Sequence, residues 1–167
     1  MDMKNKVVGI IAEYNPFHNG HKHQIFYAKE YLQADFCVIA MSGNFVQRGT
    51  PAIIDKHSRA QMAIAEGADI VFEIPACFAT GSLDDFALGS VSLLDSLGLV
   101  SHLLFGSESG NIDTISCISQ AMMADEKSFS IIRSSMKNGL SAADCQETCL
   151  SAILDKKLYA DCLGAVN

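Results

Sequence analysis

The stretch VGIIAEYNPFHNGHKHQ, residues 8–24, contains three local patterns in succession. It begins with a short apolar run rich in Val and Ile, which is typical of a strand buried on both faces. A loop marked by Asn15-Pro16 follows this run. From about residue 20 to residue 34 the apolar side chains recur at helical spacing. A buried strand that leads through a short loop into a helix predicts the first unit of a parallel α/β sheet.

The same alternation continues through most of the chain. Strands in which consecutive residues are apolar predict a parallel sheet with helices on both faces. With right-handed crossovers this gives an α/β fold, a Rossmann-like sheet in three layers with extra C-terminal helices. We expect residues 1–112 to form the Rossmann-like core and residues 113–167 to be a helical extension of the same domain. Strands are predicted over residues 6–12, 36–41, 69–74 and 102–105, and helices over residues 20–34, 57–66, 83–97, 113–123, 126–137 and 141–162.

The composition favours a folded domain without a membrane part. Hydrophobic residues make up 49% of the 167 residues and charged residues 19%, and the mean hydropathy is +0.20. A chain of this kind is too apolar to be intrinsically disordered. No apolar run reaches the roughly 18 residues that a membrane helix needs, and the first residues, MDMKNK, lack the layout of a signal peptide. We therefore expect a cytoplasmic protein.

The charge is distributed unevenly along the chain. Twelve Lys and Arg against nineteen Asp and Glu give a net charge of −7. Residues 1–59 carry seven basic and five acidic side chains. Residues 60–126 carry no basic and ten acidic side chains, and residues 127–167 carry five basic and four acidic ones. Nucleic-acid-binding proteins usually present an extended basic face. This chain has no such face as a whole, so any surface for a polyanion must be local and near the N-terminal third.

The cysteines indicate small hydrophobic side chains rather than a metal site. None of the six forms a CxxC pair, and disulfides are rare in cytosolic proteins. We expect all of them to be reduced and no metal to be bound, with a structural zinc site as the alternative. A zinc site at His18, His21 and His23 is disfavoured because no carboxylate or thiol has suitable spacing beside them. The six cysteines are Cys37, Cys77, Cys117, Cys145, Cys149 and Cys162.

The loop after the first strand is the most informative about function. In a parallel sheet of this kind, ligands bind beyond the carboxyl ends of the strands. There the loop places His18, Gly20 and His21 at the start of a helix, where unpaired N–H groups and the helix dipole attract phosphate. Gly20 lacks a side chain at the point where a nucleotide would approach the backbone. The two imidazoles could donate hydrogen bonds to phosphate oxygens and stabilise charge that develops during a displacement.

Residues 8–24, with their H-x-G-H pattern, resemble the signature of the nucleotidylyltransferase superfamily, which includes cytidylyltransferases, adenylyltransferases and class I aminoacyl-tRNA synthetases. Three further segments follow in the same order as in one branch of it: MSGNFVQRGTPAIIDKHSRAQMAIAEGADIVFEIP, FATGSLDDFALGSVSLLDSLG and LLFGSESG. Together they resemble the N-terminal domain of the bacterial tRNA(Met) cytidine acetate ligase family. The resemblance is dense over about residues 6–112 and weaker to about residue 140.

The resemblance implies an enzyme that activates acetate with ATP to acetyl-adenylate and releases pyrophosphate. The acetyl group then passes to N4 of the wobble cytidine of elongator tRNA(Met). His18 and His21 match the catalytic histidines, and Mg²⁺ is the expected counter-ion of the pyrophosphate. Ser42 and Arg48, in the loop after the second strand, are candidates for contact with the substrate. The implied ATP contacts are Ile11, Ala12, Glu13, Tyr14, Asn15, Pro16, Phe17, His18, Asn19, Gly20, His21, Lys22, His23, Gln24 and Gly106.

The chain also departs from that family. Its members continue with a Pro-Asn-Asn segment and a later arginine that contact ATP, and with a basic C-terminal part for tRNA; residues 1–167 contain none of these. The resemblance therefore implies a truncated or naturally short chain that does not bind tRNA tightly. Two alternative functions stay open, a small-molecule adenylyltransferase with another acceptor and a non-catalytic nucleotide-binding remnant.

Two local roles are also left open by the sequence. Glu13 is either a carboxylate of the reaction cleft or a cap for loop amides. For Asp55, Lys56 and Arg59, near the start of a predicted helix, a charge cluster on the surface is favoured over a functional group.

Overall fold

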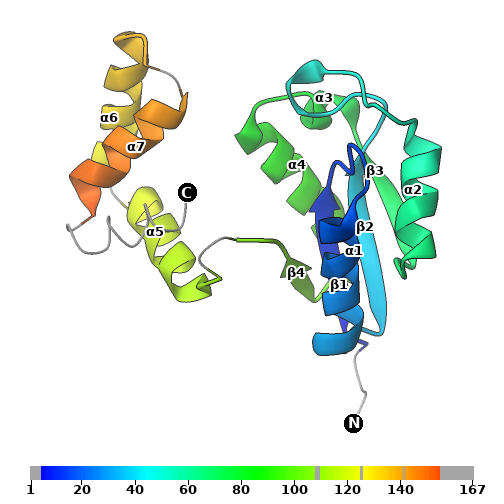
Figure 1. Cartoon of the computed structure of the whole chain (residues 1–167). Coiled ribbons are helices and arrows are strands. Elements are labelled where there is room, and N and C mark those ends of the chain that lie inside the picture. The colour runs from blue at the N-terminus through cyan, green and yellow to red at the C-terminus, as the bar shows by residue number, and fades with distance from the viewer. Residues whose placement is uncertain (1–4, 108–109, 125, 141, 155–167) are drawn as a thin grey trace. The chain divides into compact units, whose positions relative to one another are not determined.

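The computed structural model of the chain describes residues 5–107, 110–124, 126–140 and 142–154. It contains two compact units, Met1–Phe105 and Gly106–Asn167, of which the first carries the sheet (Figure 1). The sequence predicts that residues 113–167 belong to the same domain as the core, and this stays a prediction. The first unit contains β1 (Val7–Ala12), α1 (Asn19–Phe26), a π-helical turn η1 (Tyr27–Tyr31), β2 (Phe36–Ser42), a 3₁₀ turn η2 (Gln47–Gly49), α2 (Lys56–Ala65), β3 (Ile70–Ile74), α3 (Ala76–Ala79), α4 (Leu83–Ser96) and β4 (His102–Leu104).

The four strands form one parallel sheet in the order β3-β2-β1-β4. β1 lies in the interior, where Ile10 pairs with Ile39 of β2 and with Leu104 of β4. On the other side of β2, Ile39 pairs with Val71 of β3. The predicted α/β fold with a parallel sheet is therefore confirmed, and the loops that follow the strands lie at one edge of the sheet.

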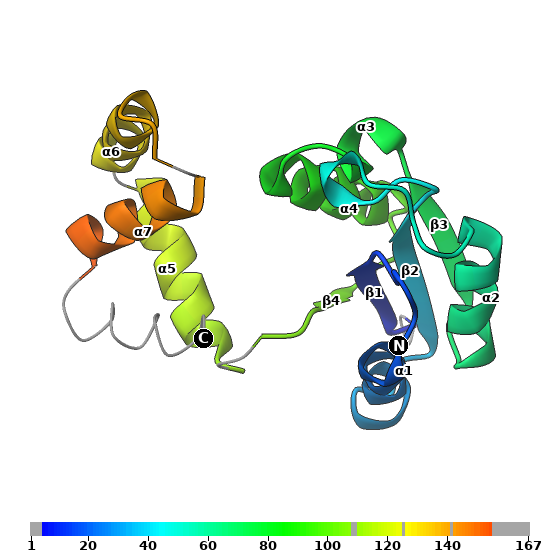
Figure 2. The ribbon, with the colours of Figure 1, turned by 45° about the horizontal axis from the view of Figure 1, so that its top comes forward.

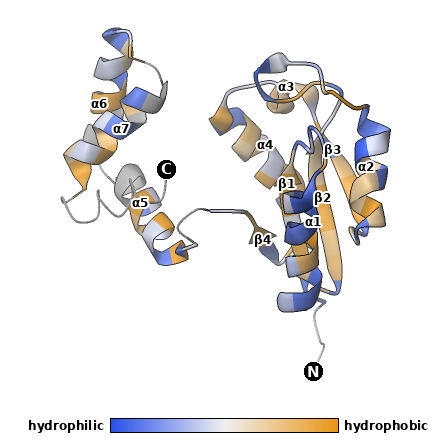
Figure 3. Ribbon diagram, viewed as in Figure 1, coloured by the Kyte–Doolittle hydropathy of each residue, from blue (hydrophilic) through white to orange (hydrophobic). Residues whose placement is uncertain are grey.

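Helices cover both faces of this sheet. α1 and α2 lie on one face, and α3 and α4 lie on the other (Figure 2). The strands are apolar along most of their length (Figure 3). In β1 and β2 consecutive residues are buried, so side chains on both faces of the sheet lie in a core. The first core joins strand residues Val8, Ile10, Cys37 and Ile39 to Ile25 and Ala28 of α1 with its π-helical turn and to Ala63 of α2. The second core joins Val7, Val38, Ala40 and Ile74 to Ala79 of α3 and Leu94 of α4.

The ends of the helices follow from local hydrogen bonds. Asp55 begins α2, because its Oδ1 accepts from the backbone N–H groups of His57 and Ser58, at 3.0 Å each. Gly67, with φ of 108°, follows the C-cap residue Glu66 at the end of α2. The helix predicted over residues 20–34 instead continues from α1 into a π-helical turn that ends at residue 31. There Gln33 adopts a φ of 52° as the chain turns back toward β2.

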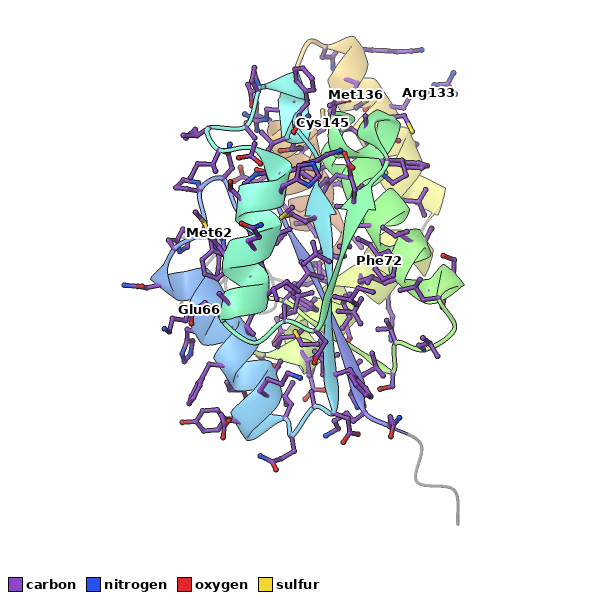
Figure 4. The ribbon with its side chains drawn as sticks, turned by 90° about the vertical axis from the view of Figure 1, so that its right-hand side faces the viewer. Met62, Glu66, Phe72, Arg133, Met136 and Cys145 are labelled. Carbon is purple, nitrogen blue, oxygen red and sulfur yellow. The ribbon has the colours of Figure 1, made fainter. Side chains whose placement is uncertain are left out.

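The second unit is helical in its described part, with α5 (Ile112–Ala124), α6 (Glu126–Lys137) and α7 (Ala142–Ile153). α7 contacts both α5 and α6. Cys145 and Cys149 are one turn apart on α7 and are both buried, whereas Met136 of α6 is exposed (Figure 4). The last part of the helix predicted over residues 141–162, together with Cys162, lies outside the described residues.

None of the helices within the described ranges is long and apolar enough to cross a membrane.

Candidate functional site

The loop that follows β1 is hydrogen-bonded to the loop that follows β2. Glu13 Oε1 accepts from the backbone N–H of Gln47 at 2.8 Å, and Asn15 Oδ1 accepts from the N–H of Ile53 at 2.7 Å. The two loops therefore lie together at the carboxyl edge of the sheet, as the parallel topology predicts. The Glu13 carboxylate caps a loop amide, which is one of the two roles that the sequence left open.

Two histidines begin α1 by capping each other's backbone. His18 is the N-cap residue, and its Nδ1 accepts from the N–H of Gly20 at 3.1 Å. His21 Nδ1 accepts from the N–H of His18 at 3.2 Å. This is the reciprocal arrangement of a capping box, made here by two imidazoles. The rings are stacked, with centroids 3.7 Å apart and 23° between their planes, so the H-x-G-H pattern fixes the positions of both.

The two caps also determine which ring nitrogen carries the proton. A neutral imidazole has one N–H donor and one acceptor nitrogen. In both rings the acceptor is Nδ1, so the proton of each neutral ring lies on Nε2. His18 is exposed and His21 is half-buried. The start of α1 thus offers two imidazole N–H donors beside the backbone N–H groups of its first turn, a combination suited to a phosphate.

Gly20 and Tyr14 support this arrangement in different ways. A Cβ atom at position 20 would lie 3.0 Å from Cε1 of His18, so a side chain there would crowd the capping ring. The ring of Tyr14 is fully buried and packs edge-on against Phe17 and His21, with centroid distances of 4.9 and 4.7 Å. Tyr14 itself has a φ of 51°, in the left-handed region, where the chain turns out of β1. The glycine therefore makes room for the ring of His18.

Burial lowers the pKa of His21 below its ordinary value of 6.5, and the nearby His18 lowers it further. An imidazolium has donors on both nitrogens, so a protonated His21 could not accept from the N–H of His18. The lowered pKa therefore favours the form that keeps the capping box. At neutral pH, His21 acts as a neutral hydrogen-bond donor rather than as a cation.

This shift predicts a pH dependence of stability. Between the lowered pKa of folded His21 and 6.5, the unfolded chain binds more protons than the folded chain, so the free energy of unfolding rises with pH. His21→Gln keeps an acceptor for the cap but does not titrate, so this part of the slope should disappear. Urea unfolding of both proteins from about pH 5 to about pH 7.5 measures it. The pKa values of Asp55 and Asp85 are lowered from 3.8, so these two groups change the free energy of unfolding only at a pH below the measured range. Equal slopes in the two proteins would contradict the assignment.

The expectation of a surface charge cluster is wrong for Arg59. Asp55 is the exposed N-cap of α2, and Lys56 forms an ion pair with Glu73 at 2.6 Å. Arg59, one turn further along α2, is fully buried. Within the described residues, every hydrogen bond of its guanidinium goes to a main-chain carbonyl. The acceptors are Ile54 (from Nε, 2.9 Å), Glu13 (from Nη1, 2.5 Å), Ser42 (from Nη1, 3.1 Å) and Gly43 (from Nη2).

The two candidates for substrate contact differ in their surroundings. Ser42 is the last residue of β2 and is fully buried, and its hydroxyl has no hydrogen-bond partner within the described structure. Arg48 is exposed on η2, where its φ of 67° lies in the left-handed region. It directly follows Gln47, whose N–H is held by Glu13. Contact of either residue with a substrate stays a prediction.

The expected ATP-contacting residues lie along one continuous stretch and at one separate glycine. Ile11 and Ala12 end β1, and Asn19 begins α1. Glu66 lies at the end of α2 (Figure 4), and its carboxylate pairs with the Lys22 ammonium at 2.7 Å. Gln24 Nε2 donates to the carbonyl of Leu104 at 3.2 Å, which joins α1 to the end of β4. Gly106 comes two residues later and begins the second unit.

The described cysteines are unbridged. They are Cys37, Cys77, Cys117, Cys145 and Cys149. Burial raises the pKa of Cys37 to about 11, so its thiol stays protonated at neutral pH. Among the residues that the structure describes, no three His, Cys, Asp or Glu side chains are arranged to hold a metal ion. The predictions that the six thiols are reduced and that no metal is bound are not decided by this.

Comparison with known proteins shows which family this chain belongs to. Residues 5–163 match the model of a family described as HIGH Nucleotidyl Transferase. The chain belongs to the HIGH nucleotidyl transferase family. The match extends over both units, and it confirms the resemblance that the sequence motifs indicate.

Relatives of this HIGH nucleotidyl transferase chain carry more specific names. The tRNA(Met) cytidine acetate ligase of Acetivibrio thermocellus is 44% identical over 87% of this chain and 35% of its own length. That of Thermosipho africanus is 44% identical over 92% and 36%. The structure of Thermotoga maritima TmcAL bound with alpha-thio ATP is 36% identical with a TM-score of 0.85, over 95% of this chain and 39% of that one. This chain thus spans between 35% and 39% of the length of these relatives.

Proposed function

We propose that this chain binds ATP over the start of α1 and transfers its adenylyl group to a carboxylate. The observation that carries the proposal is the reciprocal histidine cap, which puts two Nε2–H donors beside the N–H groups of the first helical turn. Such donors suit the phosphate chain of a nucleotide. Support also comes from the relative with a TM-score of 0.85, whose structure was solved with alpha-thio ATP bound.

In the proposed reaction a carboxylate oxygen attacks the α-phosphorus of ATP. The bond between that phosphorus and the pyrophosphate oxygen breaks, so acyl-adenylate and pyrophosphate are the products. Negative charge on the phosphoryl oxygens and the leaving group is stabilised by hydrogen bonds from the Nε2–H groups of His18 and His21, which transfer no proton. The protein contributes mainly by orienting the reactants and stabilising charge, because phosphoryl transfer requires little covalent catalysis by side chains.

The names of the relatives support acetate as the carboxylate and tRNA(Met) as the final acceptor. In the longer proteins the acetyl group would then reach N4 of the wobble cytidine. Arg48 is the exposed cation of the neighbouring loop and suits a carboxylate or a phosphate. Mg²⁺, which neutralises pyrophosphate, is usually held by substrate phosphates and one or two carboxylates. Glu13 is the carboxylate that the first loop offers for this purpose.

An exchange assay tests the proposal. Wild-type chain is incubated with ATP and labelled pyrophosphate, with acetate, without it, and with other small carboxylates, and ATP binding is measured by calorimetry. We expect ATP binding and acetate-dependent exchange. Exchange that needs a different acceptor would favour a small-molecule adenylyltransferase, and binding without exchange would favour a non-catalytic remnant. The absence of both ATP binding and pyrophosphate exchange would refute the proposal.

A further inference from the structure

Arg59 is a buried cation that the proposed reaction does not use. Its α2 backbone lies on the α1 face of the sheet, and none of its side chain is exposed. A buried cation is costly unless its donors are satisfied. Here they are satisfied by carbonyl groups of three separate segments: the loop after β1, the end of β2 with the next residue, and the residue before the α2 cap.

The geometry of the side chain suits this role. An arginine presents several N–H donors in one rigid plane, whereas a lysine has a single flexible ammonium. The Nη1 atom of Arg59 alone joins the carbonyl of Glu13, the first residue after β1, to the carbonyl of Ser42, the last residue of the neighbouring strand β2. The hydrogen bonds of the guanidinium go to neutral carbonyl groups, and the carboxylates of Asp55, Glu13 and Glu73 act on its charge without a hydrogen bond among the described residues. Packing alone therefore does not account for an arginine at this position. An apolar side chain would fill the same volume without the cost of burying a charge.

The bond to Glu13 leads directly to the candidate site. Arg59 holds the main-chain carbonyl of Glu13, while the carboxylate of Glu13 holds the N–H of Gln47, next to Arg48. The residue after Glu13 is Tyr14, whose ring packs against His21. One buried guanidinium is therefore connected through Glu13 and Tyr14 to the histidine pair, and through Glu13 and Gln47 to the exposed arginine of the second loop.

We propose that Arg59 is a positioning residue, which sets the loop carrying His18 and His21 against the loop carrying Arg48. This role rests on the proposed function, since it concerns the same nucleotide site. Arg59 touches neither ATP nor the acceptor in this role. Its effect is on where the donors lie, so its loss weakens ATP binding even when the chain is folded.

The test separates ATP affinity from stability in the whole chain. Wild type is compared with Arg59→Lys, Arg59→Gln and Leu94→Ala by calorimetry with ATP and Mg²⁺, and by thermal unfolding. Leu94 is 2% exposed and lies in the core on the other face of the sheet, so Leu94→Ala lowers stability away from the loops. We expect both Arg59 variants to bind ATP about tenfold to a hundredfold more weakly at temperatures where they are folded. Leu94→Ala should bind like wild type despite its lower melting temperature.

The other results each overturn a defined claim. Wild-type affinity in folded Arg59→Lys and Arg59→Gln would overturn the positioning role and leave the proposed function standing. An equal loss of affinity in Leu94→Ala would also overturn the positioning role, because affinity would then follow stability. If both Arg59 variants are unfolded even in the cold, Arg59 supports the whole fold and the positioning role is wrong. If the wild type does not bind ATP, the proposed function fails and the role of Arg59 fails with it.

Discussion

Replacing His18 by asparagine, or His21 by glutamine, should reduce acetate-dependent pyrophosphate exchange by about 10²–10³-fold while the chain stays folded. Each substitution keeps a side-chain oxygen where the histidine Nδ1 accepts its backbone N–H. Asparagine is a favoured N-cap residue, and glutamine is a usual partner at the third helical position. Each substitution removes the Nε2–H donor. The comparison therefore isolates the action of the imidazole on phosphate from its action on the helix start.

The measurement is the exchange rate at saturating ATP and acetate, together with thermal unfolding of each variant. His102→Gln serves as the matched control, because His102 is an exposed histidine at the first residue of β4, away from the carboxyl ends of the strands. It should exchange at the wild-type rate. The assignment is wrong if both cap variants keep most of the exchange activity. It is also wrong if the loss of exchange is explained by the lower thermal stability of the variants.

The fold could be predicted because the strands are apolar on both faces. In β1, Val7 belongs to one core while Val8 and Ile10 belong to the other, so the run shows no polar alternation. Elements without a periodic pattern were not predictable in the same way. α3 has only four residues, which is too short for a helical repeat to show. The π-helical turn after α1 is not distinguished from an α-helix by apolar spacing.

The candidate site was predictable in place but not in detail. The H-x-G-H pattern located the histidines at the start of a helix, yet their mutual capping depends on side-chain rotamers that no spacing encodes. The role of Arg59 depends on contacts distant in sequence, since Glu13 is 46 residues away. One signal was present in the sequence: Arg59 lies one helical turn before the apolar Ala63, on the face of α2 that is buried in the structure. Beside Asp55 and Lys56, the arginine nevertheless looks like part of a solvated charge cluster.

Residues 1–167 should bind tRNA(Met) no better than an unrelated RNA of the same length, and should not acetylate it. RNA affinity depends largely on Lys and Arg side chains that neutralise phosphates. Residues 60–126 carry ten acidic side chains and no Lys or Arg, and in the structure three of these acids neutralise lysines from the N-terminal part. The ion pairs are Lys22–Glu66 at 2.7 Å, Lys29–Asp69 at 2.6 Å and Lys56–Glu73 at 2.6 Å.

Filter-binding titrations with both RNAs at physiological salt measure this, followed by incubation with ATP and labelled acetate. Glu66→Lys is an informative variant, because it frees Lys22 and adds a second positive charge. It should raise the affinity for both RNAs equally, since phosphate contacts carry no sequence information, and added salt should cancel the gain. Selective micromolar binding of tRNA(Met) by the wild type, or label in its wobble cytidine, would contradict the prediction. Recognition would then depend on the shape of the RNA and on a few exposed cations such as Arg48. It would not need an extended basic surface, which this chain lacks because acidic side chains neutralise several of its lysines.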